Sequence, residues 1–263
     1  MFETNQKAET LLAWAIAGLG SSAFHEPFMQ WIHAIVPYDN ITVLAYFPLR
    51  APELLLAAAK DTSVHANFDG VYLAGAYLLD PFHELHVSGA PEGLYRLADI
   101  APDQFQRNRY FRDYYSSTSL IDEIGFVMHP CPGVSVHICL GRDASSNARF
   151  AAKELSAAQR SAAVVVALGS RQWQEFDDSR SSSEDDVITR LRNALSATHG
   201  IALSKRQSEV AMLVLKGNSS VAIGLKLGIS AQTVKVFRKQ LYRKCGISSQ
   251  AELFNLMLPL LGG

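Results

Sequence analysis

The last stretch of this chain, residues 203 to 263, decides how its C-terminal part folds. Four pieces carry the pattern: Leu203-Ser204-Lys205-Arg206-Gln207-Ser208-Glu209-Val210, Gly217-Asn218-Ser219-Ser220, Ile229-Ser230-Ala231-Gln232-Thr233-Val234-Lys235 and Lys244-Cys245-Gly246-Ile247-Ser248-Ser249. Serine is a preferred residue before a helix, and glycine is a preferred residue after one. The stretch therefore predicts several short helices joined by tight turns.

The first two helices of this stretch have clear ends. Ser204 and Gln207, three residues apart, form a capping box, and the helix that they begin has its apolar positions on one face before Gly217 ends it. A second helix begins near residues 219–220 and stops at Gly228. The tight link after Gly228 is typical of the turn of a helix-turn-helix.

A third helix, capped by Ser230, separates its residues onto two faces. The side expected to face the other helices carries Val234, Leu241 and Cys245. The side expected to face outward carries Lys235, Arg238, Lys239 and Tyr242. Three cations on one exposed helix face suit phosphates and the edges of guanine bases.

A fourth helix and an excess of positive charge complete this module. Ser249 and Glu252 form a capping box for the helix, and we expect Pro259 to mark its end. From Leu203 to Gly263 there are 9 Lys or Arg residues against 2 Asp or Glu, whereas the preceding residues have 15 against 23. A basic run on one helix is often only a solvated face, but a basic helix inside a capped helix-turn-helix favours DNA binding.

These motifs resemble the C-terminal DNA-binding domain of the LuxR family of bacterial regulators. The resemblance rests on Leu-Ser/Thr-x-Arg-x-x-Glu-Val, Gly-x-Ser-x, Ile-Ser-x-x-Thr-Val-Lys and Lys-x-Gly-Ile/Val-Ser-Ser. It implies that Lys235 and Lys239 read bases, and that Thr233, Arg238 and Ser230 contact the DNA backbone. The candidate DNA-binding set is completed by Gln232, Tyr242 and Arg243. Ala222 and Gly224 depart from the family's usual Glu and Ala, and Gly224 weakens the second helix by about 1 kcal/mol.

The preceding residues are expected to form a separate sensor domain. Helices are predicted at 8–17, 22–36, 68–79, 103–116 and 153–168, and strands at 41–47, 121–129 and 134–140, the last two as a hairpin. The fold class expected is α+β, with an N-terminal α/β/α sandwich followed by a small four-helix helix-turn-helix domain. The expected boundaries are 1–176 for the sensor, 177–200 for a polar linker with a short helix, and 201–263 for the DNA-binding domain.

The sensor has no series of acidic residues and lysine typical of a receiver domain, and it resembles instead the ligand-binding domain of the quorum-sensing LuxR branch. That branch places Trp and Tyr four residues apart ahead of Asp-Pro, with further aromatics beyond. The matching positions are Phe68, Tyr72, Tyr77, Asp80 and Tyr95. A phenyl ring cannot donate a hydrogen bond as an indole can, so the resemblance implies a ligand other than an ordinary acyl-homoserine lactone.

Each of these positions also has a structural interpretation. An aromatic stripe at helical spacing is more often plain core, and Asp80 is suited to capping a helix that begins at Pro81. Asp80, His83, Glu84 and His86 lie close in sequence, but their spacing matches no familiar metal motif, so no metal site is predicted. Cys131 has no base beside it in the sequence, so a reactive thiol is unsupported.

The function predicted is a DNA-binding transcriptional regulator, and an enzyme is not expected because no nucleophile elbow or phosphate-binding glycine loop is present. The expected partners are double-stranded DNA, a small-molecule effector, a second copy of the chain as a homodimer, and RNA polymerase, with no cofactor and no membrane. The lack of a signal peptide or a long apolar run predicts a cytoplasmic location. The alternative is a ligand-independent regulator whose N-terminal domain only dimerises or docks a partner.

Overall fold

The structure is a computed structural model that describes residues 2–48, 51–66, 68–73, 76–105, 118–176 and 184–261. The chain divides into two compact units. The first comprises Met1–Val64, Ser88–Asp99 and Ser119–Ser181, and the second comprises His65–Val87, Ile100–Thr118 and Ser182–Gly263. The predicted boundaries of the sensor, linker and DNA-binding domain stay a prediction, and most of the polar linker stretch, residues 177–183, lies outside the described residues.

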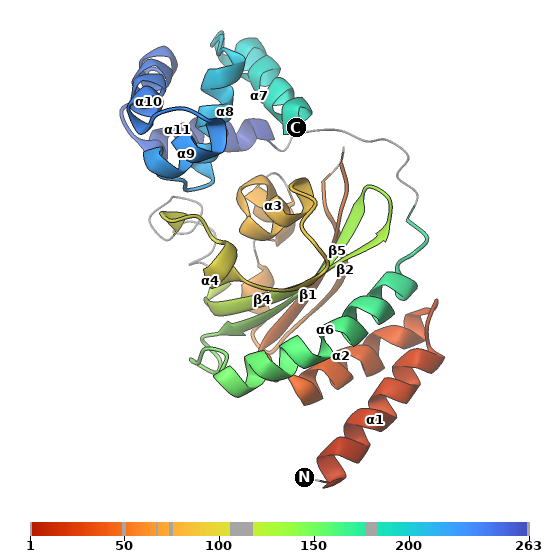
Figure 1. Ribbon diagram of the computed structural model, residues 1–263. Coiled ribbons are helices and arrows are strands. Elements are labelled where there is room, and N and C mark those ends of the chain that lie inside the picture. Colours follow the sequence, from red (N-terminus) through yellow and green to blue (C-terminus); the bar gives the residue numbers. More distant parts are fainter. Residues whose placement is uncertain are drawn as a thin grey trace. The chain divides into compact units, whose positions relative to one another are not determined.

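The first unit contains a five-stranded antiparallel sheet (Figure 1). Its strands are β1 (Asn40–Tyr46), β2 (Glu53–Ala59), β3 (Gly93–Arg96), β4 (Leu120–Cys131) and β5 (Val134–Asp143), in the order β2-β1-β5-β4-β3. The predicted hairpin is confirmed, because β4 and β5 pair directly from Leu120 opposite Asp143 to Cys131 opposite Val134. Strands β2 and β3 were not predicted: β2 is rich in Leu and Ala, which do not favour strands over helices, and β3 has only four residues.

Helices cover one face of this sheet (Figure 1). On that face lie α2 (His25–Ile35), preceded by the short η1 (Ser22–Phe24), and α6 (Ala152–Gln172), while α1 (Phe2–Ala17) packs against α2. The short α4 (Leu97–Ile100) follows β3. A core of aromatic and aliphatic side chains joins helices to sheet, and in it Phe24 stacks on Phe28 with ring centres 4.4 Å apart. Trp173, just after α6, meets Phe28 edge to face. An apolar layer of this kind stabilises helices that bury one face against a sheet.

The second unit is helical. It includes the short η3 (Phe68–Tyr72) and η4 (Ala76–Leu79), and the helices α3 (Pro81–Val87), α7 (Glu184–His199), α8 (Lys205–Leu215), α9 (Ser220–Leu227), α10 (Ala231–Cys245) and α11 (Gln250–Leu261). Another short turn, η2 (Thr62–His65), leads into it. The capping box of α8 is present, with Ser204 accepting from the Gln207 amide at 3.2 Å and Gln207 accepting from the Ser204 amide at 3.1 Å. The fold class is thus confirmed as an antiparallel sheet with helices plus a C-terminal helix-turn-helix domain.

Two predicted elements differ from the structure. In place of the single helix predicted at 68–79, Phe68–Tyr72 forms a π-helical turn and Ala76–Leu79 a 3-10 turn, consistent with the low helix propensity of Gly70. Helix α11 continues two residues beyond Pro259, which does not mark its end. A proline near a C-terminus removes only one backbone hydrogen bond, and the preceding turns can carry that loss. Most of the helix predicted at 103–116 lies outside the described residues.

A further expectation from the sequence concerns membrane-spanning helices. Among the residues that the structure describes, no helix combines the length and the apolar character needed to cross a membrane.

Candidate DNA-binding face and aromatic site

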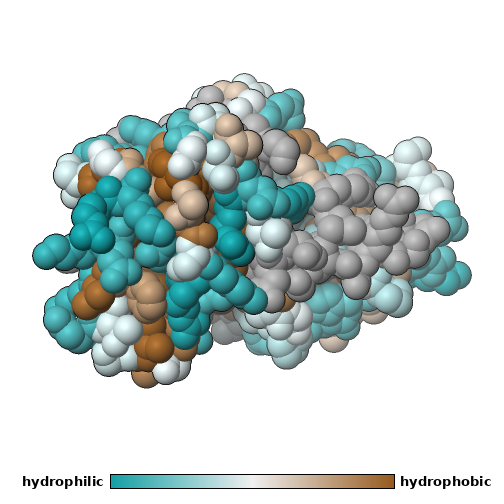
Figure 2. Space-filling model, turned by 90° about the horizontal axis from the view of Figure 1, so that it is seen from above, coloured by the Kyte–Doolittle hydropathy of each residue, from teal (hydrophilic) through white to brown (hydrophobic). Residues whose placement is uncertain are grey.

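Helix α10 is held by its buried side and displays a basic outer side. Ser230 begins it by accepting a hydrogen bond from the Thr233 amide at 3.0 Å, and Gly246 ends it with a positive φ of 66°. Val234 and Leu241 are fully buried, as predicted. The exposed residues among the candidates are Ser230, Gln232, Thr233, Lys235, Lys239 and Arg243. Figure 2, which looks down on the C-terminal helices, shows mainly hydrophilic side chains over α10 at the left of the view.

Arg238 and Tyr242 are half-buried, whereas Lys235 and Lys239 are exposed. One guanidinium nitrogen of Arg238 donates to the Ser220 hydroxyl at the start of α9, and the other donates to the Tyr242 hydroxyl, both at 3.4 Å. The guanidinium also sits over the Tyr242 ring, 5.9 Å from its centre. The place of both residues on the outward side with Lys235 and Lys239 stays a prediction, and the contact with Ser220 holds Arg238 beside the start of α9.

The cations at the centre of this face are available to an anionic partner. Within the part of the chain that the structure describes, Lys235, Lys239 and Arg243 take part in no ion pair with an acidic side chain. Other cations of the module are engaged internally: Arg206 pairs with Glu209 at 2.8 Å and donates to the carbonyl of Leu227 at 2.7 Å. The contacts of Arg206 join α8 to the end of α9, and the basic side chains of α10 remain exposed to solvent.

The candidate ligand residues of the second unit form one aromatic cluster. Phe68 and Tyr72 stack with ring centres 4.9 Å apart, and the Tyr77 ring lies 6.4 Å from that of Tyr72. The Tyr72 hydroxyl donates to Asp80 at 2.7 Å, and the ring of His83 meets Tyr77 edge to face. The structure thus brings together four of the five positions predicted from the sequence.

Asp80 is the polar centre of this cluster. One carboxylate oxygen accepts from Tyr72, and the other accepts from the Phe82 amide at 2.8 Å, which makes Asp80 the N-cap of α3. The structural interpretation of Asp80 is therefore confirmed. Burial raises the pKa of Asp80 to about 6, although the hydrogen bonds from Tyr72 and Phe82 act in the opposite direction.

The fifth ligand candidate, Tyr95, belongs to the other unit. Tyr95 lies on β3 of the first unit, where its hydroxyl donates to the carbonyl of Pro91 at 2.7 Å. No group of His, Cys, Asp or Glu residues suited to a metal ion occurs among the described residues. Glu84 forms ion pairs with Lys216 and Lys226, which the sequence does not reveal because 132 residues separate Glu84 from Lys216.

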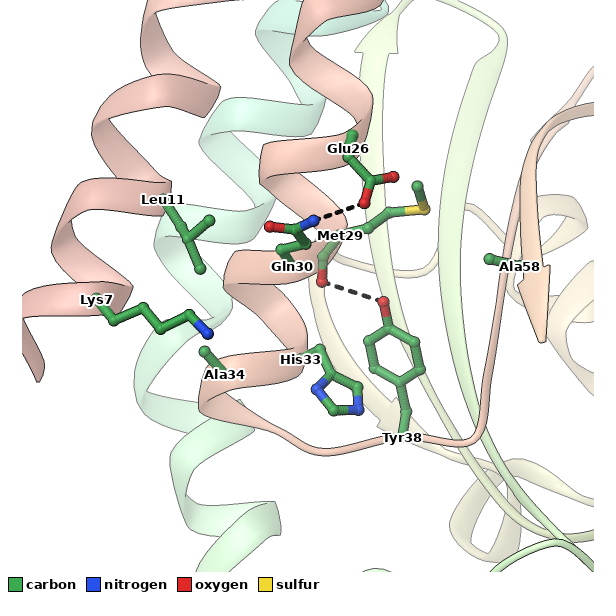
Figure 3. Close-up of a pocket in the computed structure, with 9 residues that line it drawn as sticks. All are labelled: Lys7, Leu11, Glu26, Met29, Gln30, His33, Ala34, Tyr38 and Ala58. Atoms are coloured by element: carbon green, nitrogen blue, oxygen red, sulfur yellow. Dashed lines mark hydrogen bonds between the residues drawn. The ribbon is translucent and has the colours of Figure 1, made fainter. Parts of the chain in front are cut away.

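A cavity of about 580 Å³ lies over the outer side of α2, between α1 and β2 (Figure 3). It is lined by Lys7, Leu11, Glu26, Met29, Gln30, His33, Ala34, Tyr38 and Ala58. Two hydrogen bonds organise its wall: Gln30 donates to Glu26 at 2.6 Å, and the Tyr38 hydroxyl donates to the Met29 carbonyl at 3.1 Å. Burial raises the pKa of Tyr38, so this hydroxyl stays protonated at neutral pH. None of the candidates from the sequence lines this cavity.

An antiparallel sheet with covering helices, followed by a helix-turn-helix with a basic third helix, defines a class of protein: a DNA-binding transcriptional regulator. Residues 202–257 match the family described as bacterial regulatory proteins, luxR family. The chain is 30% identical over 184 residues to a protein of Aeromonas salmonicida named as an HTH-type transcriptional regulator in the exeN 3′ region, covering 68% of this chain and 93% of that protein. The chain therefore belongs to the LuxR family of transcriptional regulators and is not an enzyme.

A solved structure supports the fold of the N-terminal part. The LBD domain of VqsR from Pseudomonas aeruginosa matches with a TM-score of 0.53 and 24% identity, over 64% of this chain and 98% of that domain. SdiA from Escherichia coli matches over 97% of this chain and 98% of its own, with a TM-score of 0.44 and 14% identity. The VqsR match shows that this part of the chain shares the fold of that domain.

Proposed function

We propose that this regulator reads DNA with the exposed face of α10 under the control of a small molecule that binds its N-terminal domain near Tyr72 and Asp80. The observation that carries the first part is the row of exposed cations Lys235, Lys239 and Arg243, which form no ion pair within the described residues, on a helix whose opposite side is buried. A helix of this kind fits the major groove, where Lys and Arg bind the acceptor atoms of guanine. The flanking Arg238, beside the start of α9, suits a backbone phosphate.

The chemistry of the aromatic cluster narrows the class of ligand. Phe68 supplies a flat apolar surface but no donor, so a lactone carbonyl would find no indole N–H there. Each oxygen of Asp80 already accepts one hydrogen bond, and a carboxylate has room for further donors. A ligand with an apolar body and an amide, hydroxyl or ammonium donor suits this site better than an ordinary acyl-homoserine lactone does.

A second candidate function is a regulator whose N-terminal domain needs no ligand. The observation that favours it is the completeness of the cluster: Asp80 caps α3 and bonds Tyr72, while Phe68, Tyr72 and Tyr77 are all buried. Side chains that satisfy one another in this way can serve as core alone. The domain would then act in dimerisation or in docking a partner.

The regulator is proposed to act as a homodimer, with RNA polymerase as a further partner. One helix-turn-helix module contacts few base pairs, whereas two copies on adjacent half-sites multiply both the phosphate contacts and the base preference.

The DNA-reading role is tested on a duplex selected by the protein from a random-sequence pool. Fluorescence anisotropy on that duplex should show Lys235→Ala or Lys239→Ala weakening binding by about 1 to 3 kcal/mol and relaxing base preference. Lys153→Ala, which removes an exposed cation of α6 in the first unit, is the matched control and should bind like the wild type. Wild-type affinity in both α10 variants would contradict the assignment.

The sensing role is tested by native mass spectrometry of protein purified gently from its own host. A dimer that retains one additional mass per chain, lost in an Asp80→Asn, Tyr72→Phe double variant that still folds, supports a ligand at this cluster. A bare wild-type dimer with no melting shift across a metabolite panel supports the ligand-independent alternative.

A further inference from the structure

Two acidic residues of the second unit hold the turn between α8 and α9. Glu84 of α3 forms ion pairs with Lys216, which directly follows α8, and with Lys226 of α9, the latter at 3.6 Å. Asp103 accepts a hydrogen bond from the Ser219 amide, the N-cap of α9, at 3.0 Å. Beside it, the backbone amide of residue 104 donates to the carbonyl of residue 217 at 3.2 Å. We refer to Glu84 and Asp103 as the acidic clasp.

The burial of Lys216 indicates that its ion pair with Glu84 contributes to the stability of this unit. The Lys216 side chain is only 8% exposed, and Glu84 is 32% exposed. A buried ammonium group is costly unless a carboxylate faces it. Burial alone would raise the pKa of Glu84, but Lys216 and Lys226 outweigh this and hold it below its usual value. Glu84 therefore stays ionised and keeps the lysine neutralised.

The acidic clasp lies where its negative charge opposes DNA binding. Lys216 and Lys226 belong to the helix-turn-helix module, and Glu84 cancels charge that would otherwise attract phosphates. Asp103 lies beside Ser219, and the next residue, Ser220, is the one that Arg238 contacts. A duplex that approached Arg238 would meet a fixed carboxylate nearby, and like charges at this distance repel.

The acidic clasp is also connected to the aromatic cluster. Asp80 caps α3, and its carbonyl accepts the first helical hydrogen bond from the Glu84 amide at 3.2 Å. Tyr72 thus bonds the side chain of Asp80 at the start of the first turn of α3, and Glu84 lies at the end of the same turn. A cavity of about 320 Å³, lined in part by Glu84, Arg206 and Lys226, leaves space beside the ion pairs. A shift of α3 would therefore break charge contacts without opening a fully packed core.

We propose that the acidic clasp weakens DNA binding by this regulator, and that a change at Tyr72 and Asp80 releases it by moving α3. The inference rests on the proposed function, since it requires that the α10 face reads DNA. It adds the contacts through which the N-terminal domain acts on the DNA-binding module.

The test compares two full-length double variants with the same loss of charge. Glu84→Gln with Asp103→Asn removes the acidic clasp, whereas Glu9→Gln with Asp99→Asn removes two exposed carboxylates of the first unit. Anisotropy on a fluorescein-labelled duplex of scrambled sequence should show the clasp variant binding about fivefold more tightly than the control variant, the lower end of typical coupling between sites. Equal affinities of the two variants would overturn the proposal, because only net charge would then matter.

A second variant guards against misfolding of the first. Asp103 is exposed, so Asp103→Asn alone should fold and still bind DNA more tightly than Asp99→Asn. Hydrogen exchange should be faster in residues 216–226 of this variant and unchanged in the control, and unchanged exchange there would argue against the clasp. If Lys235→Ala weakens binding but the clasp variants bind like the wild type, the clasp fails and the proposed function stands. If Lys235→Ala has no effect either, the proposed function fails with it.

Discussion

Replacement of Asp80 by Asn should change how the stability of the second unit depends on pH. Burial raises the pKa of Asp80 from 3.8 to about 6 in the folded protein. Between these values the folded protein holds a proton that the unfolded chain has released, so the contribution of Asp80 to stability falls as the pH rises from about 4 to about 6 and is constant above. Asn keeps an oxygen for the Phe82 amide but cannot ionise.

The size of the effect follows from the two pKa values. Their difference corresponds to about 3 kcal/mol at full titration, of which about 2 kcal/mol falls between about pH 4.5 and about pH 7. The free energy of unfolding of Asp80→Asn minus that of the wild type should therefore increase by about 2 kcal/mol over this range. Carboxylates with lowered pKa values, such as Glu84 and Asp103, are common to both proteins and cancel in the difference.

Urea unfolding followed by circular dichroism at several pH values measures this difference. Trp14, Trp31 and Trp173 all belong to the first unit, so tryptophan emission separates its transition from that of the second. Asp69→Asn, at an exposed position of η3, is the control and should give a difference that does not vary with pH. A flat difference for Asp80→Asn, or one that falls as the pH rises, would refute the reasoning that burial outweighs the two hydrogen bonds.

Two further predictions concern the DNA-binding module. A β-carbon added at Gly224 would lie 2.7 Å from the carbonyl oxygen of Ile229, so Gly224→Ala should lower the free energy of unfolding by about 1 to 3 kcal/mol in urea despite its better helix propensity. Gly70→Ala, where the added carbon meets nothing within 4 Å, is the control, and equal stability of the two variants would contradict the close approach. Arg238→Ala should weaken binding to selected and scrambled duplexes alike and reduce the slope of log affinity against log salt by about 1, whereas a loss confined to the selected duplex would indicate base reading instead.

The helix-turn-helix could be predicted closely because its signals are local. Each of its helices begins or ends at residues whose preference is set by their own backbone, such as Ser204 at a capping box or Gly228 with a φ of 64°. The same local preferences indicated Asp80 as the N-cap of α3. Proline was a weaker guide, since α11 continues past Pro259.

The sheet was harder to predict from the residues. Strand β2 lies at the sheet edge and is largely exposed, so it lacks the alternation of a half-buried strand, and Leu and Ala would equally suit a helix. Its place in the sheet comes from pairing with β1, as Asn40 opposite Ala59 shows. Pairing partners far along the chain can override local propensity, and no window of sequence contains them.

By itself, the sequence of this regulator determined its C-terminal helices, the basic face of α10, the β4–β5 hairpin and the cap of α3, because each depends on residues a few positions apart. Only the tertiary structure decided that Tyr72 donates to a buried Asp80, that Arg238 turns toward Ser220, and that Glu84 meets Lys216. These contacts depend on which surfaces fold against one another. Burial then shifts the ionisation of the groups that meet there, and neither property can be read from spacing along the chain.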